Sequence, residues 1–423
     1  MKTRILLLSL FAVLTACKAT AAGPADTGNV VRPGIEVLES RGFEGLVGKR
    51  VGLVTNPSGV TRDLRSTIDV LYHAPGVDLV ALYGPEHGVR GDVYAGGTVQ
   101  DGTDPATGIP VYSIFGAHRK PTPEMLKGVD VVVYDIQDVG SRSYTFISTL
   151  GLVMRACAEQ GIEVMVLDRP NPLGGLKVEG CYTEQGFYSF VSEFAIPYIY
   201  GLTVGELALL INEEGLNLGE KGTEAHESCK LTVIPMEGWN RGMLYADTKL
   251  PWVLPSPNIP DPQSAIGYPS AGIAGEFNGY LNIGVGYTLP FQVFAAEWID
   301  AKVLKERLDS YRLPGIAFRE IHYKPLFGAQ SGILIHGVQY FYTDYEAADI
   351  TLTQFYVMQA VHELWPDHDP FSAGTRNRMF DIVCGTDYVR IHFGERFKVA
   401  DILDYWTKDA ASFRKLSAKY YLY

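Results

Sequence analysis

Residues 77–91 are Val77-Asp78-Leu79-Val80-Ala81-Leu82-Tyr83-Gly84-Pro85-Glu86-His87-Gly88-Val89-Arg90-Gly91, an apolar segment that leads directly into a glycine-rich turn. The apolar part predicts a strand that is covered on both faces of a sheet. Gly84 and Pro85 end it, because proline lacks a donor N–H and glycine permits unusual dihedral angles. Glu86, His87 and Arg90 follow at once. Since α/β proteins place their chemistry at the carboxyl ends of core strands, this turn is predicted to be functional. The alternative is a charged surface turn.

Short apolar segments alternate with helical patterns between Gly34 and about Leu254. Besides residues 77–83, we expect strands over residues 50–55, 110–113, 129–134 and 162–167. We expect helices over residues 66–72, 123–127, 144–160 and 203–213, the last opened by a capping box at Thr203. Strands that alternate with helices predict a parallel sheet with right-handed crossovers. Residues 34–254 are therefore predicted to form an α/β domain.

The pattern changes at the proline-dense segment 255–262. Beyond it we expect strands over residues 317–323 and 333–342, and helices over residues 301–311, 352–365, 399–406 and 410–419. This mixture predicts a second, smaller α+β domain over residues 255–423. Ligand sites commonly form where two domains meet. We expect the glycine-rich stretch 275–286, which carries Asn282, to close over such a site.

Polar side chains follow three of the predicted strands at the point where each strand ends. They are Glu86, His87 and Arg90 after the first, Asp135, Asp138, Arg142 and Tyr144 after the second, and Asp168 and Asn171 after the third. Because parallel strands end at one edge of their sheet, we expect these side chains to converge on a single crevice. The alternative is that they are salt-bridged loop ends.

The first 17 residues predict a secretory signal peptide. Lys2 and Arg4 precede an apolar run that is too short to cross a bilayer. The run ends in Leu14-Thr15-Ala16-Cys17, which resembles a bacterial lipobox, and such a signal implies lipidation of Cys17 after cleavage. A plain signal peptide is the alternative. Residues 18–33 are small and polar and predict a flexible tether. We therefore expect a lipid-anchored protein of the bacterial cell envelope, facing the periplasm.

Composition excludes several classes of protein and site. The formal net charge of −12 argues against nucleic acid as a partner, because such partners need a basic surface. The remaining cysteines form no Cys-x-x-Cys pair, so a metal-thiolate site is not expected, and their spacing does not establish a disulfide. No Gly-x-Gly-x-x-Gly motif opens the helix after the first strand, which argues against a dinucleotide. We expect no cofactor.

Six motifs stand in the order that is typical of one bacterial family. They are Val51-Gly52-Leu53-Val54-Thr55-Asn56, Gly84-Pro85-Glu86-His87-Gly88, Asp135-Ile136-Gln137-Asp138-Val139-Gly140, Asp168-Arg169-Pro170-Asn171-Pro172, Pro255-Ser256-Pro257-Asn258 and Pro290-Phe291. From Gly34 to Tyr423 the chain resembles the family once called DUF1343, now represented by exo-β-N-acetylmuramidases of the NamZ type. The resemblance implies a Rossmann-like domain followed by a smaller domain. It also implies an exo-acting glycoside hydrolase that removes terminal N-acetylmuramic acid from peptidoglycan fragments, with Glu86 as the catalytic glutamate.

The chain departs from the family pattern at two places. The family usually has Ser-Glu-Gly-Arg-Gly-Thr where this chain places Ile283 and Val285 at the Glu and Arg positions, and His-Gly-Met-Thr where it has Tyr200-Gly201-Leu202-Thr203. The missing arginine would be a natural partner for the lactyl carboxylate of muramic acid. A related amino sugar is therefore an alternative substrate, and a non-catalytic cell-wall-sugar-binding lipoprotein is the alternative function.

Cleavage of a glycosidic bond needs a proton for the leaving oxygen and stabilisation of an oxocarbenium-like centre. We predict that Glu86 is the general acid, that His87 orients it, and that Asp138 or Asp135 is the second carboxylate unless the N-acetyl carbonyl of the sugar acts instead. The predicted substrate-binding residues are Arg90, Asp135, Arg142, Tyr144, Asp168, Asn171 and Asn282, with the two arginines as partners for a substrate carboxylate. Asp168 and Asn171 alternatively fix their turn. A metal-dependent hydrolase built on Glu86, His87, Asp135 and Asp138 is a further alternative, although no standard zinc motif is present.

Overall fold

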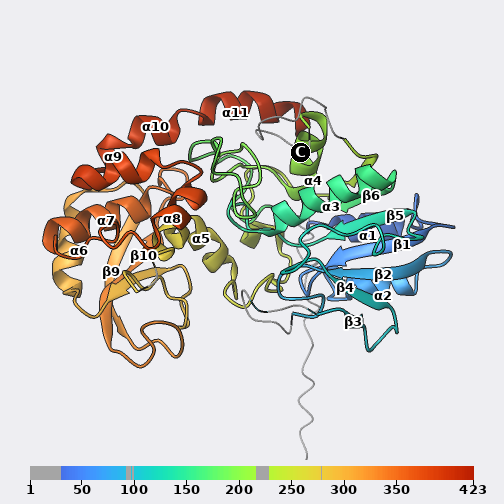
Figure 1. Ribbon diagram of the computed structural model, residues 1–423, viewed down its shortest axis with the longest axis horizontal. Helices are drawn as coiled ribbons and strands as arrows, with labels where there is room; N and C mark the ends of the chain where they lie inside the picture. The colour runs from blue at the N-terminus through green and yellow to red at the C-terminus, as the bar shows by residue number, and fades with distance from the viewer. Residues whose placement is uncertain (1–29, 92–96, 98–99, 216–227, 278) are drawn as a thin grey trace, which may run out of the picture.

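The computed structural model describes residues 30–91, 97, 100–215, 228–277 and 279–423 (Figure 1). The predicted signal peptide and Cys17 lie outside these residues, as does most of the predicted tether. In the part of the chain that is described, no helix has the length and apolar character needed to cross a membrane.

A seven-stranded sheet organises the N-terminal domain. Its order is β3-β4-β2-β1-β5-β6-β7, and every neighbouring pair is parallel except β3 with β4. The strands are β1 (Arg50–Thr55), β2 (Asp78–Gly84), β3 (Gly102–Thr103), β4 (Pro110–Ser113), β5 (Val131–Asp135), β6 (Glu163–Leu167) and β7 (Leu231–Ile234). The three central strands β2, β1 and β5 are buried along nearly their whole length, as their apolar sequences predict.

Helices cover both faces of this sheet, and each face has its own hydrophobic core. One core contains α1 (Gly34–Ser40) and α2 (Thr67–Tyr72), and the other contains α3 (Phe146–Gln160) and α4 (Val204–Glu213). The predicted helix ends are confirmed where local chemistry sets them. Gly161 ends α3 in the left-handed conformation at φ +67°, and the Thr203 side chain accepts from the backbone of Glu206 in a capping box.

The second domain is built on a smaller antiparallel sheet in the order β8-β10-β9. Its strands are β8 (Val293–Ala296), β9 (Ile316–Tyr323) and β10 (Ile335–Tyr342). Its helices are α5 (Pro262–Gly275), α6 (Ala301–Ser310), α7 (Thr353–Leu364), α8 (Asn377–Cys384) and α9 (Tyr388–Arg396). The predicted fold class, a parallel α/β domain followed by a smaller α+β domain, is confirmed.

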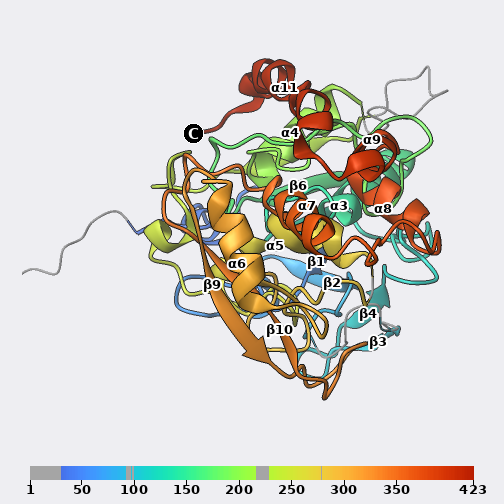
Figure 2. The same cartoon turned by 90° about the vertical axis from the view of Figure 1, so that its left-hand side faces the viewer.

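The last residues return from the second domain to the first. Helices α10 (Leu403–Thr407) and α11 (Ala410–Ser417), flanked by short 3-10 turns, arch over the top of the molecule and end beside α4 (Figures 1 and 2). Phe413 is buried in the core that holds α3 and α4. The Tyr423 hydroxyl donates a hydrogen bond of 2.7 Å to Asp168. The C-terminal segment therefore fastens the two domains together.

Two of the predicted helices were wrong, and α5 had no prediction. Residues 123–127 form turns, because Gly128 adopts φ +76° and no helix propagates beyond them. The predicted helix over residues 399–406 is divided into a 3-10 turn at Val399–Asp401 and the short helix α10. Helix α5 was not predicted, since it contains Pro269 and three glycines. Gly267 in this helix is required by packing, because a Cβ there would lie 2.0 Å from the Phe291 carbonyl oxygen.

Candidate active site

The turns after β2 and β5 bring two carboxylates to one place. The Thr145 hydroxyl donates a hydrogen bond of 3.0 Å to Oε2 of Glu86. The adjacent Tyr144 phenol lies within electrostatic reach of both Asp138 and Glu86. Burial is the main cause that raises the pKa of Tyr144, and the nearby Ser256 side chain lowers it. The negative charges of Asp138 and Glu86 raise this pKa further. Glu86 and Asp138 therefore share Tyr144 as a common neighbour.

The backbone of the turn after β2 fixes the direction in which Glu86 points. His87 is buried and adopts φ +75°, and Gly88 follows at φ +77°. The Gly88 N–H donates to the Pro85 carbonyl at 2.9 Å, which closes the turn. Positive φ is uncommon for residues other than glycine, and conformations of this kind concentrate at functional sites. Glu86 itself remains partly exposed.

Asp138 is buried, and only one of its two carboxylate oxygens is hydrogen-bonded within the described residues. Its Oδ2 accepts hydrogen bonds from the Gly140 N–H at 2.7 Å and from the Tyr200 hydroxyl. Its Oδ1 is buried and has no hydrogen-bond partner among the described residues. Burial raises the pKa of Asp138 to about 6, although the bonds from Tyr200 and the backbone lower it. Asp138 therefore combines one carboxylate oxygen that has no partner within the described residues with a pKa that burial raises.

Both domains contribute to this region. Asn56, which follows β1, donates a hydrogen bond of 3.0 Å to the Pro255 carbonyl at the start of the proline-dense crossover. The Tyr144 ring packs edge-on against Tyr268 of α5, with centroids 5.4 Å apart. Ser143 is also hydrogen-bonded to Tyr268, at 3.2 Å. The candidate active site therefore lies where the N-terminal sheet meets α5.

Asp135 is not part of this site, which corrects the prediction for it. The Asp135 side chain is fully buried and forms an ion pair with Arg169, at 2.5 Å from Nε and 2.9 Å from Nη2. The Thr67 hydroxyl also donates to it. Both oxygens are occupied, so Asp135 joins α2 to the turn after β6. Its carboxylate is therefore not placed to contact a substrate or to act as the second carboxylate.

Arg142 is likewise a structural residue, contrary to prediction. It is fully buried, and its guanidinium donates to four backbone carbonyls. These belong to Cys181 at 2.7 Å, Ile196 at 2.7 Å, Val383 at 3.2 Å and Cys384 at 2.7 Å. Because Val383 and Cys384 are the last two residues of α8, Arg142 connects the N-terminal domain to the second domain. It is not placed to bind a substrate carboxylate.

The side chains of the turn after β6, the third of the predicted turns, also point into the protein. Asp168 is fully buried and accepts hydrogen bonds from the Thr203 hydroxyl at 2.7 Å and the Gly205 N–H at 2.8 Å, besides the one from Tyr423. Asn171 is buried and bonds the Leu202 carbonyl at 2.9 Å. Of the two predicted roles for Asp168 and Asn171, fixing the turn agrees with this placement and contact with sugar hydroxyls does not.

Arg90 and Asn282 are engaged elsewhere. The Arg90 guanidinium binds the buried carboxylate of Asp104 through two hydrogen bonds, of 2.8 and 3.0 Å, so its planar fork is already occupied. The Asn282 side chain accepts from the Gly284 N–H at 2.8 Å and the Tyr323 hydroxyl at 2.7 Å. Within the described residues, the hydrogen bonds of Asn282 stay inside its own domain.

The sequence did not identify two residues of the site, Thr145 and Tyr200. Thr145 directly follows the predicted residue Tyr144, and Tyr200 appeared only as a departure from the family pattern. The residues of the metal-dependent alternative do not come together as ligands, because Asp135 is held by Arg169. Across the described residues, no group of three or more His, Cys, Asp or Glu side chains is placed to hold a metal ion.

Comparisons with known proteins agree with the fold and the motifs. The family model described as Exo-beta-N-acetylmuramidase NamZ, N-terminal, matches residues 51–263, and its C-terminal counterpart matches residues 266–423. The peptidoglycan beta-N-acetylmuramidase NamZ of Bacillus subtilis (strain 168) is 41% identical over 419 residues, which cover 98% of this chain and 97% of that protein. A crystal structure of a DUF1343 family protein from Bacteroides fragilis NCTC 9343 is 52% identical with a TM-score of 0.87, and a second from the same strain is 29% identical with a TM-score of 0.73. Each covers 93% of this chain and 99% of the other.

Proposed function

Because the chain belongs to the exo-β-N-acetylmuramidase NamZ family, we propose that it is a glycoside hydrolase that releases terminal N-acetylmuramic acid from peptidoglycan fragments. The B. subtilis relative, named for this activity, aligns along nearly the whole of both chains. The observation that carries the proposal is the pair of carboxylates, Glu86 and Asp138, that both lie within electrostatic reach of Tyr144. Two carboxylates beside one glycosidic bond are the usual equipment of such enzymes.

In the proposed mechanism, Glu86 donates its proton to the glycosidic oxygen as the bond to the anomeric carbon breaks. Thr145 holds the Glu86 carboxyl in place through its hydrogen bond. Asp138, when ionised, stabilises through its negative charge the positive charge that develops on the sugar. A water molecule then adds its oxygen to the anomeric carbon and returns a proton to the carboxylates. Asp138 or the N-acetyl carbonyl of the sugar forms the second partner in this reaction.

The arginines that were predicted to bind a substrate carboxylate already have partners within the protein. Arg90 is paired with Asp104 and Arg142 with backbone carbonyls, and neither Ile283 nor Val285 carries a charge. These losses favour the second candidate function, a protein that binds cell-wall sugars without turnover. A related amino sugar without the lactyl group is the corresponding alternative substrate.

The test compares a chromogenic N-acetylmuramide with the matching N-acetylglucosaminide on the purified protein. The proposal predicts release of the chromophore from the muramide at a clearly higher kcat/KM. Faster release from the glucosaminide would move the specificity to the alternative sugar. Measurable binding of muropeptides with no product after long incubation would establish the non-catalytic function.

We also propose that the protein is anchored in the bacterial cell envelope through a lipid on Cys17 and touches the membrane only through that lipid. The support is the lipobox-like Leu14-Thr15-Ala16-Cys17. Metabolic labelling with an alkyne fatty acid is expected to mark the wild-type chain and to leave Cys17→Ser unlabelled. Equal labelling of both would contradict the anchor.

A further inference from the structure

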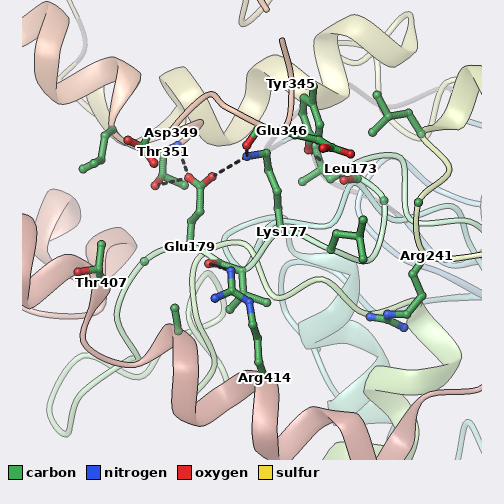
Figure 3. Close-up of a pocket in the computed structure, with 18 of the residues that line it drawn as sticks. Leu173, Lys177, Glu179, Arg241, Tyr345, Glu346, Asp349, Thr351, Thr407 and Arg414 are labelled. Carbon is green, nitrogen blue, oxygen red and sulfur yellow. Dashed lines mark hydrogen bonds and ion pairs between the residues drawn. The ribbon is translucent and has the colours of Figure 1, made fainter. Parts of the chain in front are cut away.

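A second hollow lies away from Glu86 and Asp138. This pocket of about 800 Å³ is lined by residues within four stretches of the chain, 173–180, 241–247, 344–352 and 406–414 (Figure 3). Tyr198 separates it from the candidate active site: its ring lies 6.2 Å from that of the pocket-lining Trp406, and its hydroxyl is bonded to Ser143 at 2.8 Å. The pocket is therefore distinct from the site of the proposed cleavage.

On one wall of the pocket, the guanidinium of Arg414 has N–H donors that make no hydrogen bond within the described residues. Arg414 is exposed and rises from α11 in Figure 3, where it donates one hydrogen bond, of 3.3 Å, to the Val178 carbonyl. Within the described part of the chain no carboxylate pairs with it. A guanidinium has five N–H donors, so several remain for a ligand. Arg241, also in the pocket, is instead committed to Glu206 through two contacts of 2.8 and 2.9 Å.

The opposite rim offers carboxylates. Glu346 and Asp349 are exposed, and neither side chain has an ion-pair partner among the described residues (Figure 3). Lys177 fixes the loop that carries them, because its ammonium donates to the carbonyls of Glu346 at 3.1 Å and Ala348 at 2.7 Å. The two acidic groups therefore stand at defined positions across the pocket from Arg414.

The pocket wall between these charges is hydrogen-bonded and partly apolar. The Glu179 carboxylate accepts from the Thr351 N–H at 2.8 Å, the Thr351 hydroxyl at 2.9 Å and the Ile350 N–H at 3.2 Å, which anchors the loop to the pocket wall. The buried side chains of Leu173 and Trp406 contribute apolar surface. Preformed pockets of this kind, with a few fixed polar groups on apolar walls, are suited to small ligands.

We propose that this pocket binds a short zwitterionic peptide, with a carboxylate on Arg414 and an ammonium on Glu346 and Asp349. A simple anion would be repelled by Glu346 and Asp349, and a simple cation would make no bond with Arg414. A neutral sugar would pair with neither the acidic groups nor the guanidinium. Charge-assisted hydrogen bonds at both ends give the peptide its orientation. The inference rests on the proposed function, because peptidoglycan fragments carry short peptides with free carboxylates and a free amine.

The test is calorimetric titration of the full chain with the tripeptide N-acetyl-L-alanyl-γ-D-glutamyl-L-lysine, whose only ammonium is on the lysine side chain. Arg414→Gln is expected to weaken binding at least about fivefold, and Glu346→Gln with Asp349→Asn to do the same. Lys415→Gln, on a neighbouring residue outside the pocket lining, is the matched control and is expected to bind like the wild type. Acetylation of the lysine side chain of the peptide is expected to remove the contribution of the acidic rim.

No heat of binding up to about 10 mM peptide, or equal affinity in Arg414→Gln, would overturn the proposal. Binding of an uncharged chitobiose with the same dependence on Arg414 would overturn the peptide assignment. Hydrolysis of the chromogenic N-acetylmuramide is measured on the same samples and is expected to be unchanged in Arg414→Gln. If the wild type hydrolyses the muramide but does not bind the peptide, only the peptide-binding proposal is rejected. If it binds the peptide but does not hydrolyse the muramide, only the proposed hydrolase activity is rejected.

Discussion

The Thr145 hydroxyl donates its hydrogen bond to Glu86, 59 positions away in the sequence, and not to the helix that Thr145 precedes. Threonine at the residue before a helix ordinarily accepts a bond from the first turn of that helix. Here α3 has no side-chain cap of this kind. A local rule is broken at the point where a candidate catalytic carboxylate needs support, and such exceptions are expected at functional sites.

Replacement of Thr145 tests this support. Thr145→Val keeps the shape of the side chain and removes the donor. The kcat for the chromogenic muramide is expected to fall about tenfold, because the hydroxyl stabilises the carboxylate that Glu86 becomes as it gives up its proton. KM and the thermal midpoint are expected to change little, because the hydroxyl does not cap α3. Thr145→Ser is the control and is expected to keep most of the activity. An unchanged kcat in the valine variant would contradict the role.

Tyr200 is expected to set the pH range of activity. Its hydroxyl donates to Asp138 and lowers the pKa of this carboxyl, which burial raises to about 6. In Tyr200→Phe the pKa of Asp138 rises further, so the acidic limb of the kcat/KM profile is expected to move about one unit to higher pH. Tyr245→Phe, which removes a buried hydroxyl bonded to the Pro251 carbonyl, is the control. Coincident profiles for all three proteins would exclude Asp138 as the titrating group.

Asp168 links stability to pH. Burial raises its pKa from the ordinary 3.8 to about 6, so the protonated carboxyl favours the folded state. The resulting stability is complete below about pH 3.8 and is lost as the pH rises through about 6, a difference of about 3 kcal/mol at 1.36 kcal/mol per pKa unit. Asp168→Asn has no such loss. The variant is therefore expected to gain about 1 kcal/mol over the wild type between pH 5 and pH 8.

Urea unfolding at the two pH values measures this gain. Asp404→Asn, at an exposed carboxylate, is the control and is expected to follow the wild type at both. A constant difference between Asp168→Asn and the wild type across the pH range would contradict the assignment.

Replacement of Arg142 tests whether this residue stabilises the fold or binds substrate. Arg142→Lys keeps the charge but cannot reach four carbonyls, so the free energy of unfolding is expected to fall by at least about 2 kcal/mol. The KM of the folded fraction is expected to stay near the wild-type value. Arg378→Lys, at an exposed guanidinium bonded to the Gly186 carbonyl, is the control. Normal stability with a raised KM would restore the predicted role in substrate binding.

The sequence predicts the sheet well because its signals are local. Apolar runs mark the central strands, and Gly161 and Thr203 mark helix ends through their own backbone and side-chain chemistry. The roles of the carboxylates and guanidinium groups at the strand ends could not be predicted in the same way. Asp135 and Asp138 look equivalent in sequence, but Arg169 neutralises the first while the second keeps an open oxygen.

Long-range pairing decides these differences, and spacing does not reveal it. The acceptors of Arg142 lie between 39 and 242 positions away along the chain. The partner of Asp168 at Tyr423 lies 255 positions away. Glu86 was identified through the family motif and the end of its strand, whereas its support from Thr145 required the fold.

The activity of Glu86→Gln tests the proposed chemistry most directly. Glutamine preserves the size of the side chain and can still accept the bond from Thr145, but it has no proton to donate to the leaving oxygen. Release of the terminal sugar is expected to fall at least about a hundredfold with the thermal midpoint retained. Turnover within a factor of about two of the wild type would show that Glu86 is not the general acid and would contradict the account.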